Sequence, residues 1–283
     1  MTLLDDPAFW RFPVTAQLVS MGVFLLAAGP LTALAWLDPA RLRPYRLQSR
    51  CHAARKQVPK AALYWLGNNL LMFALVVLLW PWLRELGVDT SARAPSVLEV
   101  AASLALFIVL DDFAYYWMHR GFHAHPVLYE RIHKVHHRVV TPWALAAHTM
   151  HPVEFILTGA LTLLWPVLFG AHVVTIWCWV AFRQLEAADG HSGYVLPWNP
   201  LHLVPTYKGA GFHDLHHARF RGNYAGFLPY LDRLFGTQAE ALGARAGAAV
   251  AAIESAVTGA SSTAGDAELR AARASGEEPR GAP

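Results

Sequence analysis

Histidine is the residue type whose number and spacing point most directly to chemistry in this chain. The 283 residues include 15 histidines, and 14 of them lie in the segment 119–217. Most belong to three clusters, which read HRGFH, HKVHH and HDLHH. Residues three and four apart lie on one face of a helix, so each helical cluster would present its imidazoles to a common centre. The clustered residues are His119 and His123; His133, His136 and His137; and His213, His216 and His217.

Neutral imidazole is a good ligand for zinc, copper, iron and nickel. A tetrahedral zinc site needs four ligands, and a catalytic one usually takes three from the protein. The clusters supply too many imidazoles for one such ion, and they therefore predict a centre with two metal ions. His191, in DGHSGY, can add a ligand from another element, and His148 and His151 are weaker candidates. Asp112 precedes the first cluster on roughly the same helix face, where we expect it to accept an imidazole N–H and orient a ligand.

Other catalytic motifs are missing from the sequence. There is no GxSxG, no HExxH, no Walker-type GxxxxGK[ST] and no GxGxxG followed by a suitably placed acid. With no sign of a nicotinamide or flavin site, an oxidising enzyme built on this chain would receive its electrons from a partner.

The elements that position the histidines are predicted to be membrane helices. The chain is 55% hydrophobic and 15% charged, with a mean hydropathy of +0.29, whereas soluble domains are about 25% charged. We expect membrane spans at about 15–37, 61–83 and 97–118, because each apolar run can cross a bilayer core of about 30 Å. The broken apolar stretch 153–182 predicts a membrane hairpin that enters and leaves on one face. The predicted fold class is thus an all-α integral membrane protein with about three transmembrane helices, a hairpin and a helical histidine-box cap.

The charge distribution predicts the orientation of these spans. Segment 38–60 carries seven basic residues and a single acid, Asp38. Between two spans such a loop is cytoplasmic by the positive-inside rule, and it indicates topology rather than nucleic-acid binding. A third span returns the chain to that side, which places the histidine boxes there as well.

Three regions are expected along the chain. Residues 1–96 would form the N-terminal transmembrane region with its basic loop, and 97–237 the metal-binding catalytic domain. Residues 238–283 are rich in Ala, Gly and Ser and have no aromatic residue or histidine, so we expect a disordered tail.

The histidine boxes resemble those of the fatty acid hydroxylase/sterol desaturase superfamily of membrane-bound non-haem di-iron oxygenases. Within it, the sequence looks most similar to the C-4 sterol methyl oxidases, through HKVHH, AHTMHPVE and the stretch from HSGY to GNY and DRLFGT. The resemblance covers roughly 119–237. It implies that the eight clustered histidines bind metal, together with His191 and His151. Two departures are Ala187, where the fatty acid branch has a histidine, and Phe212 at the start of the third box.

The resemblance implies a dioxygen-dependent monooxygenase with two iron ions, which zinc can replace in purified samples. Its substrate would be the 4-methyl group of a sterol, oxidised through alcohol and aldehyde to carboxylate. Its electrons would come from a b-type cytochrome or a ferredoxin with its reductase. Alternatives are a hydroxylase or desaturase of another lipid (a fatty acyl chain or a carotenoid) and a histidine-rich membrane metal carrier or sensor. Aromatic residues considered for a substrate channel are Phe107, Tyr115, Trp117, Trp165 and Trp177.

Overall fold

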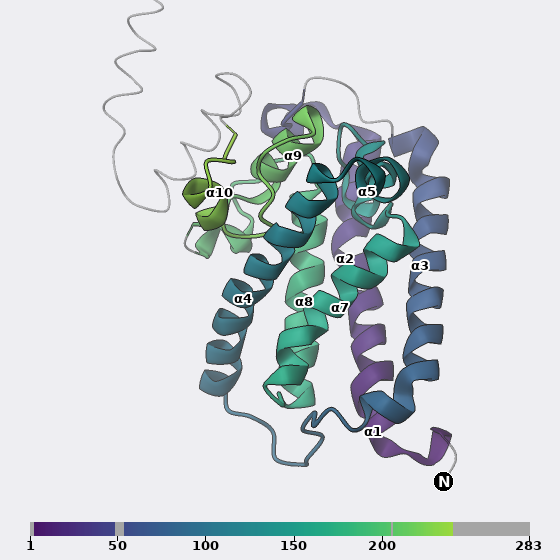
Figure 1. Ribbon diagram of the computed structural model, residues 1–283. Coiled ribbons are helices and arrows are strands. Elements are labelled where there is room, and N and C mark those ends of the chain that lie inside the picture. The colour runs from purple at the N-terminus through teal and green to yellow at the C-terminus, as the bar shows by residue number, and fades with distance from the viewer. Residues whose placement is uncertain (1–2, 49–53, 205, 240–283) are drawn as a thin grey trace, which may run out of the picture.

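Long helices form the body of the protein (Figure 1). Short helical elements gather at one end of them, among them α5 (Pro126–Leu128), α9 (Gly209–Arg219) and α10 (Tyr230–Leu234), and α1 (Pro7–Phe9) lies at the other end. The computed structural model describes residues 3–48, 54–204 and 206–239, and within these ranges the chain is helical with no strand beyond two isolated bridges. The predicted tail lies almost entirely outside the described residues. The long helices are α2 (Thr15–Leu37), α3 (Ala54–Leu83), α4 (Val97–Ala124), α7 (Pro152–Leu168) and α8 (Val173–Gly190).

Local sequence signals set where several of these helices begin and end. Ser96 starts α4 with a capping box, in which its hydroxyl accepts from Glu99 N–H and the Glu99 carboxylate accepts from Ser96 N–H. At the C-terminal end of α2, Asp38 adopts a left-handed backbone conformation and ends the helix. These caps fix the lengths over which the apolar helices pack.

Two helical segments of the described chain are long and apolar enough to cross a membrane. They span Pro7–Leu37 and Lys56–Leu83, and they include the first two predicted spans. The predicted third span corresponds to α4, which carries Asp111 and Asp112 on its buried face. The total number of spans and their orientation stay predictions.

The apolar stretch after residue 152 folds as a helical hairpin. Helix α7 leads away from the short elements, and α8 returns alongside it (Figure 1). His172 begins α8 by accepting from Val174 N–H. The two helices form a hairpin, as predicted, and the place of this hairpin in a membrane stays a prediction. Because α8 returns toward the histidine boxes, His191 at its C-terminal end lies beside them.

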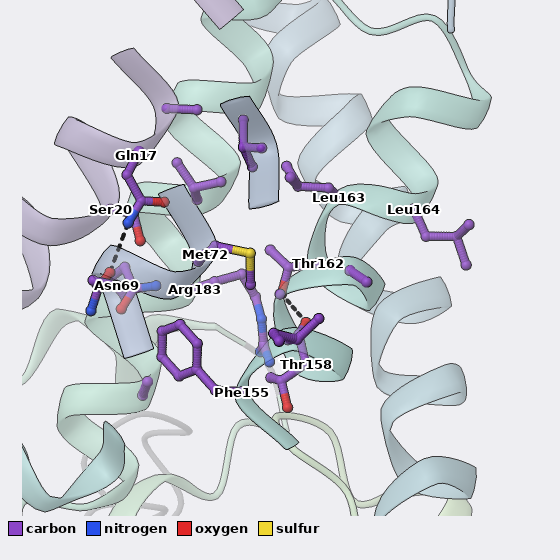
Figure 2. A pocket seen from close by; sticks show the side chains of 18 of the residues that line it. Gln17, Ser20, Asn69, Met72, Phe155, Thr158, Thr162, Leu163, Leu164 and Arg183 are labelled. Carbon is purple, nitrogen blue, oxygen red and sulfur yellow. Dashed lines mark hydrogen bonds between the residues drawn. The ribbon is translucent and has the colours of Figure 1, made fainter. Parts of the chain in front are cut away.

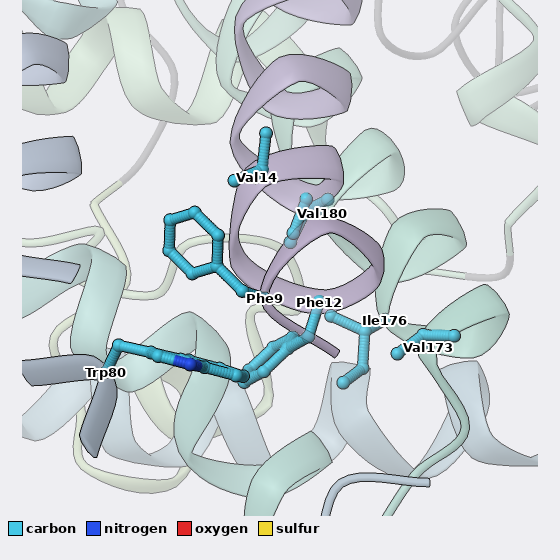
Figure 3. Close-up of a cluster of buried hydrophobic side chains, with 8 residues drawn as sticks. Phe9, Phe12, Val14, Trp80, Val173, Ile176 and Val180 are labelled. Carbon is cyan, nitrogen blue, oxygen red and sulfur yellow. The ribbon is translucent and has the colours of Figure 1, made fainter. Parts of the chain in front are cut away.

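A buried apolar cluster holds the opposite end of the bundle together (Figure 3). Rings from the start of the chain pack edge-on against Trp80 of α3, and the Phe9 and Trp80 centroids lie 5.5 Å apart. Trp80 also donates its indole N–H to Asp6 at 3.1 Å. Aliphatic side chains of α8 complete the cluster, which comprises Phe9, Phe12, Val14, Ala16, Trp80, Val173, Ile176 and Val180. It ties the N-terminal segment to α3 and to α8 and so fixes the helix on which the hairpin returns.

Candidate metal centre

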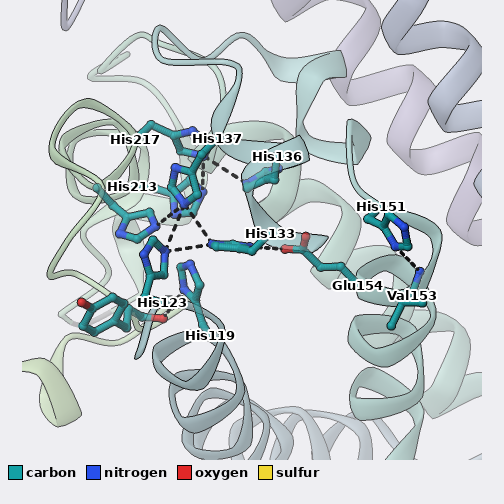
Figure 4. Close-up of polar contacts among 12 residues, drawn as sticks. His119, His123, His133, His136, His137, His151, Val153, Glu154, His213 and His217 are labelled. Carbon is teal, nitrogen blue, oxygen red and sulfur yellow. Dashed lines mark hydrogen bonds and ion pairs between the residues drawn. The ribbon is translucent and has the colours of Figure 1, made fainter. Parts of the chain in front are cut away.

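Nine of the predicted histidines meet at one end of the bundle, the end at which α9 lies (Figure 1, Figure 4). The first box is at the C-terminal end of α4, and the second runs through a π-helical turn (η4, Tyr129–His133) into α6 (Lys134–His137). The third box lies on α9 (Gly209–Arg219), and His191 caps α8. Four separate stretches of chain thus deliver imidazoles to one place.

The imidazoles form two groups, and in each group the potential ligand atoms lie within 4.8 Å of one another. Each group combines residues of the second box with residues of α9, so the two groups are neighbours. The first group is His119, His123, His133, His137 and His216, and the second is His136, His191, His213 and His217.

Hydrogen bonds to backbone carbonyls orient several of these rings. The Nδ1 atoms of His119 and His216 lie 2.8 Å and 2.6 Å from the carbonyl oxygens of Tyr224 and Gly222. In the second group, Nδ1 of His191 and of His217 lies 3.0 Å and 2.8 Å from carbonyl oxygens of Ala187 and Val139. A carbonyl only accepts, so Nδ1 carries the hydrogen and Nε2 of each neutral ring presents a lone pair. This is the arrangement of metal-binding histidines.

The Nε2 atoms converge as closely as ligands on a cation do. In the first group, Nε2 of His133 lies 2.9 Å from Nε2 of both His123 and His137. In the second, Nε2 of His217 lies 3.1 Å from that of His136 and of His213. Two nitrogens bound at right angles with bonds of about 2.1 Å lie about 3.0 Å apart. Facing lone pairs repel unless a cation lies between them, so the donor set fits two metal ions.

Burial keeps the imidazoles in the neutral, ligating form. The side chains of His216 and His217 are completely buried, and removal from water lowers the pKa of both well below the usual 6.5. Burial lowers the pKa of His191 to about 4. None of these rings needs to lose a proton at neutral pH before it binds a metal.

Glu154, in the first turn of α7, is a site residue that the sequence analysis missed. Its Oε1 lies 2.7 Å from Nδ1 of His133, and both side chains are buried (Figure 4). A carboxylate in this position orients the ring and makes its Nε2 a stronger donor to a metal. The available signal was the acid of HPVE, which comes three residues after the candidate His151.

Asp112 has other partners than the expected imidazole. Its carboxylate accepts from the backbone N–H groups of Gly226, Phe227 and Leu228 at 2.8–3.0 Å, and no hydrogen bond joins it to a histidine of the described chain. The loop it holds follows Tyr224, whose carbonyl orients His119. Asp112 therefore supports the metal centre through the backbone.

His151 lies outside both groups. Its Nδ1 accepts from Val153 N–H at 3.2 Å and caps α7 (Figure 4). His148 is buried against Phe24, with ring centroids 3.8 Å apart and the rings parallel. Neither ring is brought to the imidazole groups, so the structure separates these two histidines from the other candidates.

A large apolar cavity runs between the long helices and reaches the metal centre. Its volume is about 500 Å³, which is in the range of sites that bury a small organic ligand. His191 and His213 of the second group line one part of it, and Leu83 and Leu168 line another. Figure 2 shows polar side chains in the wall of the cavity, among them Gln17 and Asn69, whose side chains are joined by a 2.8 Å hydrogen bond.

Only one of the five aromatic residues considered for a channel lines this cavity. Tyr115 does, and its ring centroid lies 5.3 Å from that of His119. Phe107 packs instead against Trp179, with centroids 5.8 Å apart. The cavity wall is otherwise mainly aliphatic.

Comparison with known proteins agrees with this geometry. The family model for fatty acid hydroxylase matches residues 104–237. Methylsterol monooxygenase 2-2 of Arabidopsis thaliana is 35% identical over 243 residues, which is 81% of this chain and 90% of the relative. Methylsterol monooxygenase 2-1 of the same plant is 31% identical over 81% of this chain and 92% of the relative. Very-long-chain aldehyde decarbonylase GL1-8 of Oryza sativa subsp. indica is 35% identical over 81% of this chain and 89% of the relative. No solved structure matches.

The chain is a helical oxidoreductase, as its relatives show, in which two groups of histidines could hold metal ions. The chain belongs to the fatty acid hydroxylase family, as the similarity over most of its length shows.

Proposed function

We propose that the protein is a membrane-bound di-iron monooxygenase that oxidises a C–H bond of a lipid, namely the 4-methyl group of a sterol. The observation that carries the proposal is the contact between an apolar cavity of about 500 Å³ and the second of two neighbouring imidazole groups. The reaction type and the sterol also follow the relatives named methylsterol monooxygenase. The product series would be alcohol, aldehyde and carboxylate.

In this proposal the histidines of each imidazole group bind one iron ion. Iron would supply dioxygen activation when bound, and the protein would hold the ligand rings and the substrate. His133 is oriented by Glu154, and His119, His191, His216 and His217 by backbone carbonyls. The fixed rings hold both ions in place through the oxidation cycle.

The apolar cavity positions the substrate and keeps bulk water from the reacting carbon. Its wall at the second group includes Gly190, which directly precedes His191, and this small residue leaves room for a methyl group to approach. Exclusion of water protects a reactive oxidant from side reactions.

The remaining partners belong to the proposal as well. Electrons would reach the centre from a b-type cytochrome or a ferredoxin with its reductase. We place the histidine boxes on the cytoplasmic side, since the basic segment 38–60 favours that orientation, and we assign catalysis to residues 97–237, which contain every histidine of both groups.

A second lipid class has a specific observation in its favour, because similar relatives are named very-long-chain aldehyde decarbonylase. The test is metal quantification together with lipid analysis of cells that express the protein or its His216→Ala variant. We expect about two iron ions per chain, and oxidised 4-methylsterols only with the unaltered protein. Unchanged sterols beside an altered long-chain lipid would favour the second class. One exchangeable zinc ion without dioxygen consumption would indicate a metal carrier.

A further inference from the structure

We propose that Tyr115 binds a hydroxyl group of the lipid substrate and thereby sets which carbon faces the metal centre. This inference rests on the proposed function, and it narrows the substrate to lipids that carry a hydroxyl close to the oxidised carbon. Tyr115 is a positioning residue in this account.

The position of Tyr115 joins the cavity to the first imidazole group. It lies one helical turn before His119 on α4, and the two ring centroids are 5.3 Å apart. The same side chain lines the cavity. A substrate group held by its hydroxyl would therefore lie beside the metal ligands rather than at the far end among Leu83 and Leu168.

The surrounding backbone is shaped to seat this ring. A Cβ atom at Gly226 would lie 3.2 Å from Cδ1 of Tyr115, so the glycine allows the close approach. The loop at Gly226 is held by Asp112, which accepts from its N–H at 2.9 Å. The side chain of Tyr115 is thus fixed on two sides before any ligand enters.

The hydroxyl of Tyr115 has no hydrogen-bond partner within the described parts of the chain, and the residue is half-buried in the wall of the cavity. A ligand that fills the cavity and excludes water would leave this hydroxyl without a partner unless the ligand supplied one, which favours a ligand that carries a hydroxyl. Gln184 lines the same cavity, and its Oε1 is buried without a partner. Together they offer a donor and an acceptor.

Several other polar side chains of the cavity already have partners. Arg183 donates to Glu186 at 2.9 Å, and the amide of Gln17 donates to Asn69 at 2.8 Å. Tyr115 and Gln184 lie on helices α4 and α8, which flank the imidazole groups, whereas His148, whose unpartnered Nδ1 also belongs to a residue of the cavity wall, is part of neither group.

The chemistry of this arrangement suits a sterol and not a plain hydrocarbon chain. In a 4-methylsterol the 3-hydroxyl is on the carbon next to the one that bears the methyl group. One hydrogen bond from Tyr115 to that oxygen would hold the methyl group within a few bonds of the anchor. A saturated acyl chain has no hydroxyl at that distance and would bind in many registers.

The experiment measures binding, so that it does not depend on turnover. Full-length protein in lipid nanodiscs, loaded with zinc, is titrated with a 4-methylsterol and with the same sterol lacking its 3-hydroxyl. We expect the unaltered protein to bind the hydroxylated sterol about tenfold more tightly, as one well-placed hydrogen bond allows. Tyr115→Phe should abolish most of that preference and bind the deoxy sterol as before. Tyr64→Phe, on α3 and outside this cavity, is the matched control and should keep the preference.

The two proposals fail in different ways. Equal affinity of the unaltered protein for the two sterols, or an undiminished preference in Tyr115→Phe, would overturn the role of Tyr115 even if the iron-loaded enzyme oxidises methylsterols. A preference that disappears in Tyr115→Phe supports the hydroxyl site even if the iron-loaded enzyme leaves the methyl group unchanged, and in that case the proposed reaction is wrong. Metal content of each variant, measured alongside, shows that the Tyr115→Phe protein is folded at its centre.

Discussion

The Nδ1 atom of His133 and the Oε1 atom of Glu154 lie 2.7 Å apart, and both side chains are buried. This contact links helix α7 of the hairpin to the second histidine box. It gives the first imidazole group a side-chain carboxyl partner, whereas other rings are oriented by backbone carbonyl groups. The carboxylate therefore adjusts the electron-donating strength of one ligand in a way that the backbone does not.

Replacement of Glu154 should weaken metal binding in the first group. We expect Glu154→Leu to lower iron affinity about 10- to 100-fold, because it removes the partner of a ligating ring. Glu154→Gln retains an acceptor for the ring N–H and should retain most of the metal. Competition with a chelator of known affinity measures the effect. Glu130→Gln is the control, since Glu130 is exposed and pairs with Lys134; equal losses in Glu154→Leu and this control would refute the assignment.

One ligand from each group provides a test of the two-ion centre. His216→Ala and His136→Ala should each abolish activity and remove about one of two bound ions, because the substitutions affect different groups. Element analysis of purified protein gives the metal content, and the amount in the membrane fraction shows whether the variants insert. His125→Ala, an exposed histidine at the end of α4, should have little effect. Two retained ions and full turnover in either ligand variant would show that the ligand assignment is wrong.

Asp112 should contribute to stability through the loop that it holds. Asp112→Ala removes the acceptor of three backbone N–H groups, and each buried donor left without a partner costs about 1–3 kcal/mol. We expect a Tm lower by at least about 5 °C and weaker metal binding. Asp112→Asn should be intermediate, because one oxygen accepts two of the three bonds. Glu85→Gln, at an exposed carboxylate, should leave the Tm unchanged. A Tm of Asp112→Ala equal to that of the control would contradict this role.

Asp214 predicts a dependence of stability on pH. Burial raises the pKa of this carboxyl from 3.8 to about 7, and a 2.9 Å hydrogen bond from Gln48 opposes the shift. Between pH 4 and 7 the folded state binds a proton that the unfolded state lacks, so this contribution to stability falls as pH rises. Asp214→Asn removes the titration and keeps the Gln48 contact. With both proteins free of metal, the Tm of Asp214→Asn should exceed that of the unaltered protein by more at pH 8 than at pH 5. The reverse order would rule out a protonated buried carboxyl.

Gly159 provides a test of the cavity that leaves the metal ligands untouched. A Cβ atom there would lie 2.7 Å from the terminal methyl carbon of Met72, and both residues line the cavity. Gly159→Val should narrow the cavity and weaken lipid binding roughly tenfold, as overpacking a filled site does. Metal content should not change. Gly67→Val is the matched control on α3, because nothing lies within 4 Å of a Cβ at Gly67. Normal lipid affinity in Gly159→Val would mean that substrate binds elsewhere.

Helical spacing accounts for the part of the site that could be predicted from sequence. The i, i+3 and i+4 pattern gave the eight box histidines, His191 was added as a ligand from another element, and these nine imidazoles meet in the structure. Spacing alone did not assign rings to ions. His216 belongs to one group and its neighbour His217 to the other, because consecutive residues on α9 point about 100° apart.

Long-range contacts account for what was not predicted. The carboxylate of Glu154 meets His133 across 21 positions, and Asp112 reaches a loop more than 100 positions away. Asp112 was the expected ligand partner because it precedes His119 on one helix face, but the return of the chain at Gly226 offers it three N–H donors at hydrogen-bond distance. The apolar stretch 153–182 was predicted as a hairpin, and its helices agree. The orientation of the spans depends on the charges of the loops and on the membrane. The packing of the helices does not determine it.

The division of α9 between the two imidazole groups has a consequence for how the protein is made. Each group includes at least one of His213, His216 and His217. In the proposed di-iron centre, neither ion would have its full set of ligands until residue 217 has been synthesised, after the long helices. The ions would then join α4, α6, the end of α8 and α9 as the last cross-links to form. In this proposal, a cell short of iron would accumulate full-length chains whose histidine boxes are not yet held together.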